Sequence, residues 1–324
     1  MRAVIQSDPS NTAPDSLQVG DVPRPTPGPG EVLIRVTAAG VNRADTLQRQ
    51  GNYPPPKGAS DILGLEVSGH IATIGPGVRD WKLGQPCVAL LAGGGYAEYV
   101  AVPAGQVVPP PEGIDLVSAA GIIEVAATVV SNLELAGLQR RNTILIHGGA
   151  GGIGGFAIPY AKHLGVRVIS TAGSEEKRQH CRRLGADVVL DHHEDWAAGV
   201  RDAAEDGVDV ILDIIGAKYL HDHLKLLATG GRIITIGLQG GTKAELNLGL
   251  LLAKRASIHA TGLRARPVSE KTVIVNRVVE TVWPLLVDGT IPLAQERRYP
   301  LAAVADAHAH LDSGEASGKL ILTL

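Results

Sequence analysis

The spacing of apolar residues changes near residue 115 and divides the chain into two parts. Before that point, short apolar runs are separated by Pro and Gly, a pattern typical of strands joined by turns. Three of these runs are Glu31–Thr37, Val67–Ile74 and Tyr96–Val102. We therefore expect residues 1–113 to be all-β.

After about Asp115, helix-length apolar segments alternate with short apolar runs that predict strands. The predicted strands are Asn142–His147, Arg167–Thr171, Asp187–Leu190, Asp209–Asp213 and Arg232–Ile236. A repeated order of strand, helix and strand predicts a parallel sheet covered by helices.

The C-terminal part begins with a long helical stretch near Pro267 and ends in a predicted strand, Lys319–Leu324. We expect this strand to return to the first domain. The prediction is thus an α/β protein, in which a β-rich domain of residues 1–124 and 266–324 receives an inserted doubly wound domain of residues 125–265.

A glycine-rich turn directly follows the predicted strand Asn142–His147 and precedes a helical segment. Strand, glycine turn, helix and second strand within about 30 residues are typical of dinucleotide-binding folds. Glycines let the backbone approach a pyrophosphate, and the N–H groups at the start of a helix favour its charge. The alternative is an ordinary glycine turn. The residues that we expect to bind the cofactor here are Gly148, Gly151, Gly152, Ile153 and Gly154.

The end of the second predicted strand indicates which nicotinamide cofactor binds. In NAD-binding domains a carboxylate about 20 residues beyond the glycines binds the ribose 2′-hydroxyl, but no acid stands in Ala172-Gly173-Ser174. Ser174, Lys177 and Arg178 can instead donate to a 2′-phosphate. We therefore expect NADPH, with Gly173, Ser174 and Lys177 among its contacts. In the alternative interpretation, Ser174 only caps the next helix and the basic residues are solvated.

Composition and charge exclude several classes of function. A formal net charge of −3 gives no basic surface for nucleic acid. Cys87 and Cys181 are too few for a disulfide framework or a cysteine-rich zinc lobe, and we expect both to be reduced and buried. The N-terminus has no apolar signal region and no segment is apolar over about 18 residues, so we expect a cytoplasmic enzyme without membrane contact.

Motifs along nearly the whole chain resemble the medium-chain dehydrogenase/reductase superfamily. They are Val41–Asp45, Gly51–Pro56, Ile62–Gly69, Gly94–Tyr99, Gly148–Gly154, Thr171–Lys177, Leu263–Arg266 and Ser317–Lys319. The closest resemblance is to the zinc-free quinone oxidoreductases, in particular the p53-inducible NAD(P)H quinone oxidoreductase branch. This resemblance implies a GroES-like catalytic domain, a Rossmann domain for NADPH and a homodimer.

The positions of the zinc ligands in zinc-dependent relatives hold other residues in this chain. Those relatives place Cys near position 42 and His at 65 before a Glu, whereas this chain has Asn42, Leu65 and Glu66. Cys87 alone cannot hold the metal. We therefore expect no catalytic metal, and we expect the histidine pairs at 192–193, 221–223 and 308–310 to be surface residues rather than ligands.

Hydride transfer to a quinone or a conjugated enone produces an oxyanion, which needs hydrogen-bond donors. Asn42 and Tyr53 are the candidates, because the matching Asn and Tyr of the resembled family border the nicotinamide and the substrate pocket. Packing of a loop aromatic is the alternative for Tyr53. The family also has a basic residue near Arg264 that reaches the cofactor or the pocket, so we expect Tyr53, Asn42 and Arg264 to be catalytic.

The resemblance implies further cofactor contacts. Glu124 and Thr128 match residues on the nicotinamide side, and His192 stands where the closest branch has a Tyr against the adenosine phosphate. A purely structural role is an equal alternative for Lys319. The further expected cofactor residues are Glu124, Thr128, His192, Ile215, Gly237, Leu238, Arg264 and Lys319.

The leading hypothesis is a zinc-independent, NADPH-dependent reductase that transfers hydride to a quinone. A 2-alkenal or enoyl reductase of the same superfamily is an alternative, because the same donors would stabilise an enolate. An alternative of another class is a non-catalytic NADPH-binding sensor or structural protein. A zinc alcohol dehydrogenase has the least support, because its ligands are missing.

Overall fold

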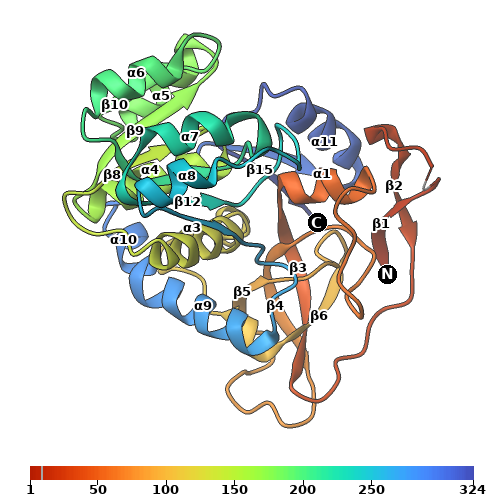
Figure 1. The fold of residues 1–324 in the computed structure, drawn as a ribbon. Helices are drawn as coiled ribbons and strands as arrows, with labels where there is room; N and C mark the ends of the chain where they lie inside the picture. Colours follow the sequence, from red (N-terminus) through yellow and green to blue (C-terminus); the bar gives the residue numbers. More distant parts are fainter. Residues whose placement is uncertain (9) are drawn as a thin grey trace. The chain divides into compact units, whose positions relative to one another are not determined.

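The computed structural model describes residues 1–8 and 10–324 and separates into two compact units. Unit 1 consists of Met1–Ala127, Leu263–Gly289 and Leu293–Leu324. Unit 2 consists of Thr128–Gly262 and Thr290–Pro292. In Figure 1, unit 1 is coloured from red to yellow and again in blue, and unit 2 lies mainly between yellow-green and cyan.

Unit 2 contains a six-stranded sheet whose strands are all parallel, in the order β10-β9-β8-β11-β12-β13. Its strands are β8 (Thr143–Ile146), β9 (Arg167–Ala172), β10 (Val188–Asp191), β11 (Val208–Asp213), β12 (Leu227–Thr235) and β13 (Ser257–Ala260). This is the strand order of doubly wound nucleotide-binding domains, with the switch of direction beside the first strand, β8. The predicted parallel sheet is thus confirmed.

The helices of unit 2 follow the strands and cover a core of branched apolar side chains, among them Leu145, Ile169 and Ile211. They are α4 (Gly152–His163), α5 (Glu175–Arg183), α6 (Trp196–Ala203), η3 (Ala217–Tyr219), α7 (Leu220–Leu226) and α8 (Leu248–Ala253), and α3 (Ile123–Leu135) enters the unit at Thr128. None of the helices in the described residues is long and apolar enough to cross a membrane.

Unit 1 is built on a seven-stranded sheet, in the order β14-β15-β3-β4-β5-β7 with β6 paired to β3, and a small sheet of β1 and β2. The strands are β1 (Arg2–Gln6), β2 (Leu17–Asp21), β3 (Glu31–Val41), β4 (Glu66–Ile74), β5 (Pro86–Leu90), β6 (Tyr99–Pro103), β7 (Val107–Val108), β14 (Glu296–Pro300) and β15 (Lys319–Thr323). The C-terminal β15 pairs antiparallel with β3, which confirms that the last strand returns to the β-rich part.

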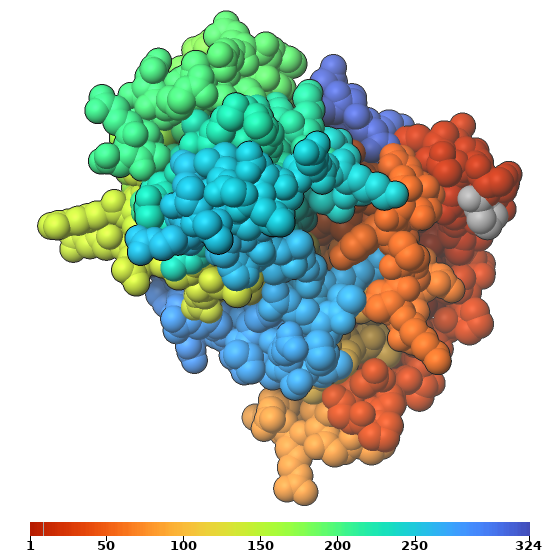
Figure 2. Space-filling view, viewed as in Figure 1, coloured from red at the N-terminus to blue at the C-terminus, as the bar shows by residue number. Residues whose placement is uncertain are grey.

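Short helices surround the sheet of unit 1. They are η1 (Pro14–Ser16), α1 (Arg43–Arg49), η2 (Ala104–Gln106), α2 (Leu116–Ala119), α9 (Val268–Thr281), α10 (Trp283–Val287), η4 (Leu301–Ala303) and α11 (Val304–Asp312). Helix α9 packs against η2, and Figure 2 shows the blue C-terminal part of this unit beside its orange N-terminal part. The predicted α/β class is confirmed, since unit 1 is rich in β-strands and unit 2 holds a parallel sheet flanked by helices.

The expectation that residues 1–113 are all-β is wrong at helix α1. Asp45, at the third position of the helix, accepts the backbone N–H of Asn42 at 2.8 Å, which is half of a capping box. Helix α1 therefore begins directly after strand β3 and orients Asn42 at its start.

Candidate functional site

The glycine turn of unit 2 joins β8 to α4 through a backbone that favours glycine at Gly148 and Gly154. Gly148 has a φ of 68°, a conformation that favours glycine. A Cβ on Gly154 would lie 2.5 Å from the carbonyl oxygen of Gly148 and 2.5 Å from the Cα of Gly149. The start of α4 therefore lies directly against the turn.

The first turn of α4 presents N–H groups that no side chain caps. The residue before the helix is Gly151, and its backbone is extended. Gly152, Ile153 and Gly154 are the first three helical residues, whose N–H groups have no partner within an α-helix. With the positive end of the helix dipole, they form a site for an anionic oxygen.

The residues after β9 pack closely against two histidines, a contact that the sequence does not indicate. Ser174 caps α5, because its hydroxyl accepts the N–H of Lys177 at 3.3 Å. A Cβ on Gly173 would lie 2.6 Å from Cε1 of His192 and 3.1 Å from Nε2 of His193. Both imidazoles therefore lie beside Gly173, and the sequence does not reveal His193 as a neighbour.

Arg178 is held by carboxylates, contrary to the expectation that it donates to a 2′-phosphate. Its guanidinium pairs with Glu175 at 2.9 Å and also with Asp191. Asp191 further accepts the N–H of His193 at 2.9 Å. The carboxylate at the end of β10 is thereby neutralised, and Arg178 positions it.

In unit 1, the predicted catalytic Asn42 belongs to a buried triad with Glu66 and Lys319. The Lys319 ammonium lies 2.6 Å from Glu66 Oε1 and donates to Asn42 Oδ1 at 2.7 Å. Asn42 Nδ2 donates to Glu66 Oε1 at 2.9 Å. The carbonyl side of the amide thus faces a cation and the amino side faces an anion, so its orientation is fixed and its second N–H has a defined direction.

Two glycines make room for the triad. A Cβ on Gly40 would lie 2.3 Å from Glu66 Oε1, and one on Gly121 would lie 2.7 Å from Cγ of Lys319. The backbone N–H of Glu124 donates to Glu66 Oε2 at 3.0 Å. The sequence indicates Glu66 only as the neighbour of Leu65, and it does not reveal either glycine because the atoms that crowd them come from distant segments.

Asp45, behind Asn42, is a fully buried carboxylate with three donors. The N–H groups of Asn42 and Gly64 donate to it at 2.8 and 3.1 Å, and the Tyr96 hydroxyl donates at 3.0 Å. Burial nevertheless raises the pKa of Asp45 from 3.8 to about 6. This carboxylate therefore links the start of α1 to Gly64, just before strand β4, and Glu66 is the first residue of that strand.

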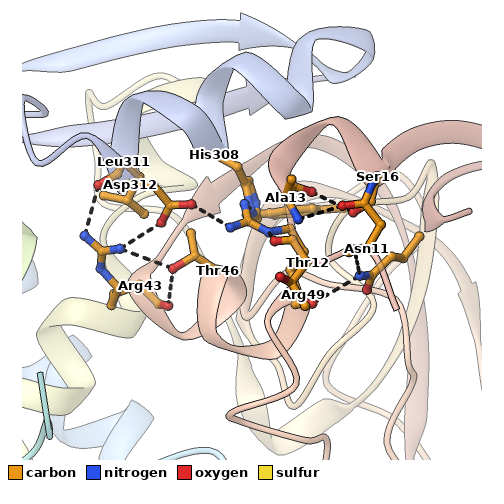
Figure 3. Close-up of polar contacts among 12 residues, drawn as sticks. Asn11, Thr12, Ala13, Ser16, Arg43, Thr46, Arg49, His308, Leu311 and Asp312 are labelled. Atoms are coloured by element: carbon orange, nitrogen blue, oxygen red, sulfur yellow. Dashed lines mark hydrogen bonds and ion pairs between the residues drawn. The ribbon is translucent and has the colours of Figure 1, made fainter. Parts of the chain in front are cut away.

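The polar contacts that begin at Asp45 continue through Tyr96 to a polar cluster between α1 and α11. His308 Nε2 lies 3.4 Å from the Tyr96 hydroxyl, and Arg49 lies 3.1 Å from His308 Nδ1 and 2.5 Å from Asp312. Figure 3 shows Arg49 pointing toward both. His308 is fully buried, so the expectation that its pair lies on the surface is wrong for this residue. Its Nδ1 faces a guanidinium donor, which leaves Nε2 to donate to Tyr96.

Stability should depend on pH through Asp45. The Asp45 carboxyl group has a higher pKa in the folded state than in the unfolded state. Its contribution to stability is therefore fully present below pH 3.8 and is lost as the pH rises through about 6. The Asp45→Asn variant should lack this dependence, so its free energy of unfolding relative to the unmodified chain should shift by about 2 kcal/mol between pH 4 and pH 7. Denaturant unfolding at several pH values measures it, with exposed Asp61→Asn as the control. Parallel pH profiles for the unmodified chain and Asp45→Asn would contradict the role of Asp45.

Tyr53 lies in a loop of unit 1 that Arg264 holds in place. The buried guanidinium donates to the carbonyl oxygens of Ala92 at 2.7 Å and Tyr53 at 3.1 Å, and to Gln48 Oε1 at 2.7 Å. Its carbon lies 5.4 Å from the Tyr53 ring centre. Burial raises the pKa of the Tyr53 phenol, so the hydroxyl stays protonated at neutral pH and can donate. Arg264 therefore positions Tyr53, and the N–H groups that make these contacts are occupied by hydrogen bonds within the protein.

The remaining predicted cofactor residues lie on α3 and after two strands of unit 2. Glu124 and Thr128 are on the first turns of α3. The N–H of Ile215 donates to Asp213 at 2.8 Å after β11. A Cβ on Gly237 would lie 2.8 Å from the carbonyl oxygen of Ile214, so the loops after β11 and β12 pack closely. Leu238 follows Gly237 and is exposed.

The residues considered for metal binding do not form a cluster. Within residues 1–8 and 10–324, no group of three His, Cys, Asp or Glu side chains is arranged to hold a metal ion. Cys87 and Cys181 are both buried and free. Burial raises the pKa of Cys87 to about 12, so this thiol stays protonated and is a poor metal ligand.

Comparison with known proteins places both units in one superfamily. The family model of the alcohol dehydrogenase GroES-like domain matches residues 28–112, and that of the zinc-binding dehydrogenases matches residues 152–276. A mycocerosic acid synthase-like polyketide synthase of Mycobacterium tuberculosis is 34% identical over 314 residues. That match covers 95% of this chain and 15% of the synthase, so the chain spans a small part of such relatives.

Several solved structures are similar over their whole length. A mycobacterial protein complexed with NADPH has a TM-score of 0.89 and 32% identity, and the match covers 100% of both chains. A mycobacterial quinone oxidoreductase has a TM-score of 0.86 and 30% identity, again over 100% of both chains. The quinone oxidoreductase of Escherichia coli, complexed with NADPH, has a TM-score of 0.88 and 27% identity over 100% of this chain and 99% of that chain. This chain therefore belongs to the medium-chain dehydrogenase/reductase superfamily.

Proposed function

We propose that this protein is an NADPH-dependent reductase that transfers hydride to a quinone without a catalytic metal. The observation that carries the proposal is the uncapped first turn of α4 at Gly152–Gly154, at the carboxyl end of the central strand of a doubly wound sheet. Within the superfamily we assign the chain to the zinc-free quinone oxidoreductases, near the p53-inducible branch, on the motifs that it shares with them.

The residues of unit 2 fit NADPH. The N–H groups of α4 would hold the pyrophosphate. Ser174, Lys177 and His192 lie at or beside the end of β9, where a 2′-phosphate binds in this fold. The carboxylate there, Asp191, pairs with Arg178, so it does not repel a phosphate as a free acid would. Two of the similar structures were solved with NADPH, which supports the same cofactor here.

The residues of unit 1 suit the negative charge that forms on the acceptor. When bound, NADPH supplies a hydride, and the acceptor oxygen becomes an oxyanion. The second N–H of Asn42 and the hydroxyl of Tyr53 are the proposed donors to that oxygen. Lys319 contacts the carbonyl side of the Asn42 amide, and its positive charge polarises the amide and strengthens its N–H as a donor. Arg264 holds the loop that carries Tyr53.

Reduction of a conjugated carbon–carbon double bond is the second candidate. The support for it is sequence similarity: two mycobacterial polyketide synthases each contain a segment that is similar to nearly the whole chain. An enolate oxygen would accept hydrogen bonds from the same Asn42 and Tyr53. The two reactions therefore differ in the acceptor and share the proposed donors.

The test is to mix the protein with NADPH and, separately, a small quinone and a 2-alkenal, and to follow the absorbance of the reduced cofactor. We expect turnover with the quinone, and a loss of about 100-fold in kcat for Tyr53→Phe, as when an oxyanion donor is removed. Tyr299→Phe is the control, since this phenol contacts His310 elsewhere in unit 1. Turnover with the alkenal alone would establish the second candidate. Tight NADPH binding with no turnover would replace both by a sensor or structural role.

A further inference from the structure

Two buried histidines form an unexpected pair beside the glycine turn. His147 follows β8 directly before Gly148, and His223 lies on α7. Their Nε2 atoms are 2.8 Å apart, and both side chains are almost fully buried. The rings of Trp196 and Tyr219 lie 4.9 and 5.2 Å from that of His147. The expectation that the 221–223 pair is a surface feature is therefore wrong for His223.

The partners of the pair lie at the carboxyl ends of three adjacent strands. His147 Nδ1 lies 3.0 Å from the Thr171 hydroxyl in β9, which also accepts the N–H of Gly148 at 3.4 Å. His223 Nδ1 has no hydrogen-bond partner within the described chain, and it points toward Asp213 of β11, 3.9 Å away. Asp213 in turn accepts the N–H groups of the segment after β11, which are those of Ile215 and Gly216.

The distances determine where the protons lie. Two Nε2 atoms at hydrogen-bond distance require that one carries a hydrogen and the other does not. If His223 were the donor, its Nδ1 lone pair would face the Asp213 carboxylate, which is repulsive. His147 is therefore the donor, His223 Nδ1–H faces Asp213, and the Thr171 hydroxyl donates to His147. Burial lowers the pKa of both imidazoles, which keeps the pair neutral.

We propose that His147 and His223 are positioning residues that hold the glycine turn in register with the segment after β11 and thereby set the affinity for NADPH. The hydrogen bonds run in one direction from the Gly148 N–H through Thr171 and His147 to His223, whose Nδ1–H faces the Asp213 carboxylate 3.9 Å away. One end is the glycine turn that leads into α4, which the proposed function assigns to the cofactor, and the other is the segment after β11, which holds the predicted cofactor residue Ile215. This inference therefore rests on the NADPH part of that function. An apolar pair would fill the space without the desolvation cost of two imidazoles, but it could not fix the turn.

The test compares two substitutions of His223 in the full chain. His223→Gln keeps an acceptor at about the reach of Nε2, and His223→Leu keeps the volume without it. We expect His223→Leu to weaken NADPH binding, titrated by fluorescence, by about tenfold, and His223→Gln to recover most of the affinity. The loss should appear in the KM for NADPH rather than in kcat. His221→Gln, an exposed histidine on the same helix, is the control and should bind as the unmodified chain does.

Three results would overturn the inference. One is equal NADPH affinity for folded His223→Leu and the unmodified chain, and another is equal weakening by Leu and Gln. The third comes from the unmodified chain, so it needs no variant to fold: imidazole ¹⁵N spectra that place the shared hydrogen on His223 Nε2 would reverse the assigned proton order. Failure of the unmodified chain itself to bind NADPH would instead remove the proposed cofactor and the inference with it.

Discussion

Replacing Gly154 by alanine is expected to weaken NADPH binding by ~10-fold to 100-fold, since overpacking a tight contact costs ~1–3 kcal/mol. The new Cβ would lie 2.5 Å from the Gly148 carbonyl oxygen and 2.5 Å from the Gly149 Cα. Both are backbone atoms, so the contact is relieved only if the turn opens or α4 moves away. Either change displaces the N–H groups at the start of α4. Fluorescence titration with NADPH measures the affinity directly.

Gly155→Ala is a control that differs by one position. In the same helix, its Cβ would lie 4.0 Å from Leu184 Cδ1, an ordinary van der Waals contact, and among the described residues no atom outside the helix's own backbone would be closer. Alanine also favours a helix over glycine by ~1 kcal/mol, so this variant should be at least as stable as the unmodified chain and bind NADPH as tightly. Equal affinity for Gly154→Ala and Gly155→Ala would show that the turn does not set the cofactor affinity.

The contrast between these two glycines shows which features the sequence predicts and which it does not. The turn itself is predictable, because a strand, a glycine cluster and a helix follow one another within a short stretch. The same holds for the parallel strands of unit 2, which depend on local apolar patterns. Gly154 and Gly155 look alike in the sequence, however. Only the backbone packing distinguishes the one that touches Gly148 from the one that does not.

The start of helix α1 could have been predicted from the sequence. Asn42 and Asp45 have the spacing of a helix start with a carboxylate at the third position, but the Pro- and Gly-rich surroundings favour strands and turns. The sequence does not reveal that the Asn42 side chain also contacts Lys319. These residues are 277 positions apart, and Arg264 meets Gln48 over 216 positions. The first contact depends on the register of β15 against β3, and the second joins the segment before α9 to helix α1. Local patterns determine neither.

Arg178 illustrates a second limit. A basic residue after β9 favours a 2′-phosphate site from the sequence alone, because the carboxylates that meet it are not apparent. The structure pairs it with Glu175, three positions before it, and with Asp191 on the neighbouring strand. The first contact is a common helix pair, so it could have been weighed; the second requires the sheet order.

The largest loss of stability is expected from Lys319→Met. Glu66 is fully buried, so removal of the ammonium at 2.6 Å leaves a carboxylate whose donors within the described chain are the Asn42 amide and the Glu124 N–H. Breaking a buried ion pair in this way destabilises a protein by ~3–5 kcal/mol. Urea unfolding without cofactor, followed by tryptophan fluorescence, measures the change, since two of the three tryptophans, Trp81 and Trp283, belong to unit 1.

The double variant Glu66→Gln/Lys319→Met separates an unpaired charge from lost packing. With both charges gone, the introduced glutamine amide can still accept the Glu124 N–H, and most of the lost stability should return, so that the two substitutions couple by ~2 kcal/mol or more. Lys162→Met is the exposed counterpart, because the Lys162–Asp187 pair is about one-third exposed on each side and should contribute less than ~1 kcal/mol. If the double variant is no more stable than Lys319→Met, the loss comes from packing around Gly121 and the triad does not act as a charge pair. If it recovers, Lys319 and Glu66 hold the Asn42 amide electrostatically, and a sequence that keeps Asn42 but loses Lys319 should lose the orientation of its proposed donor as well.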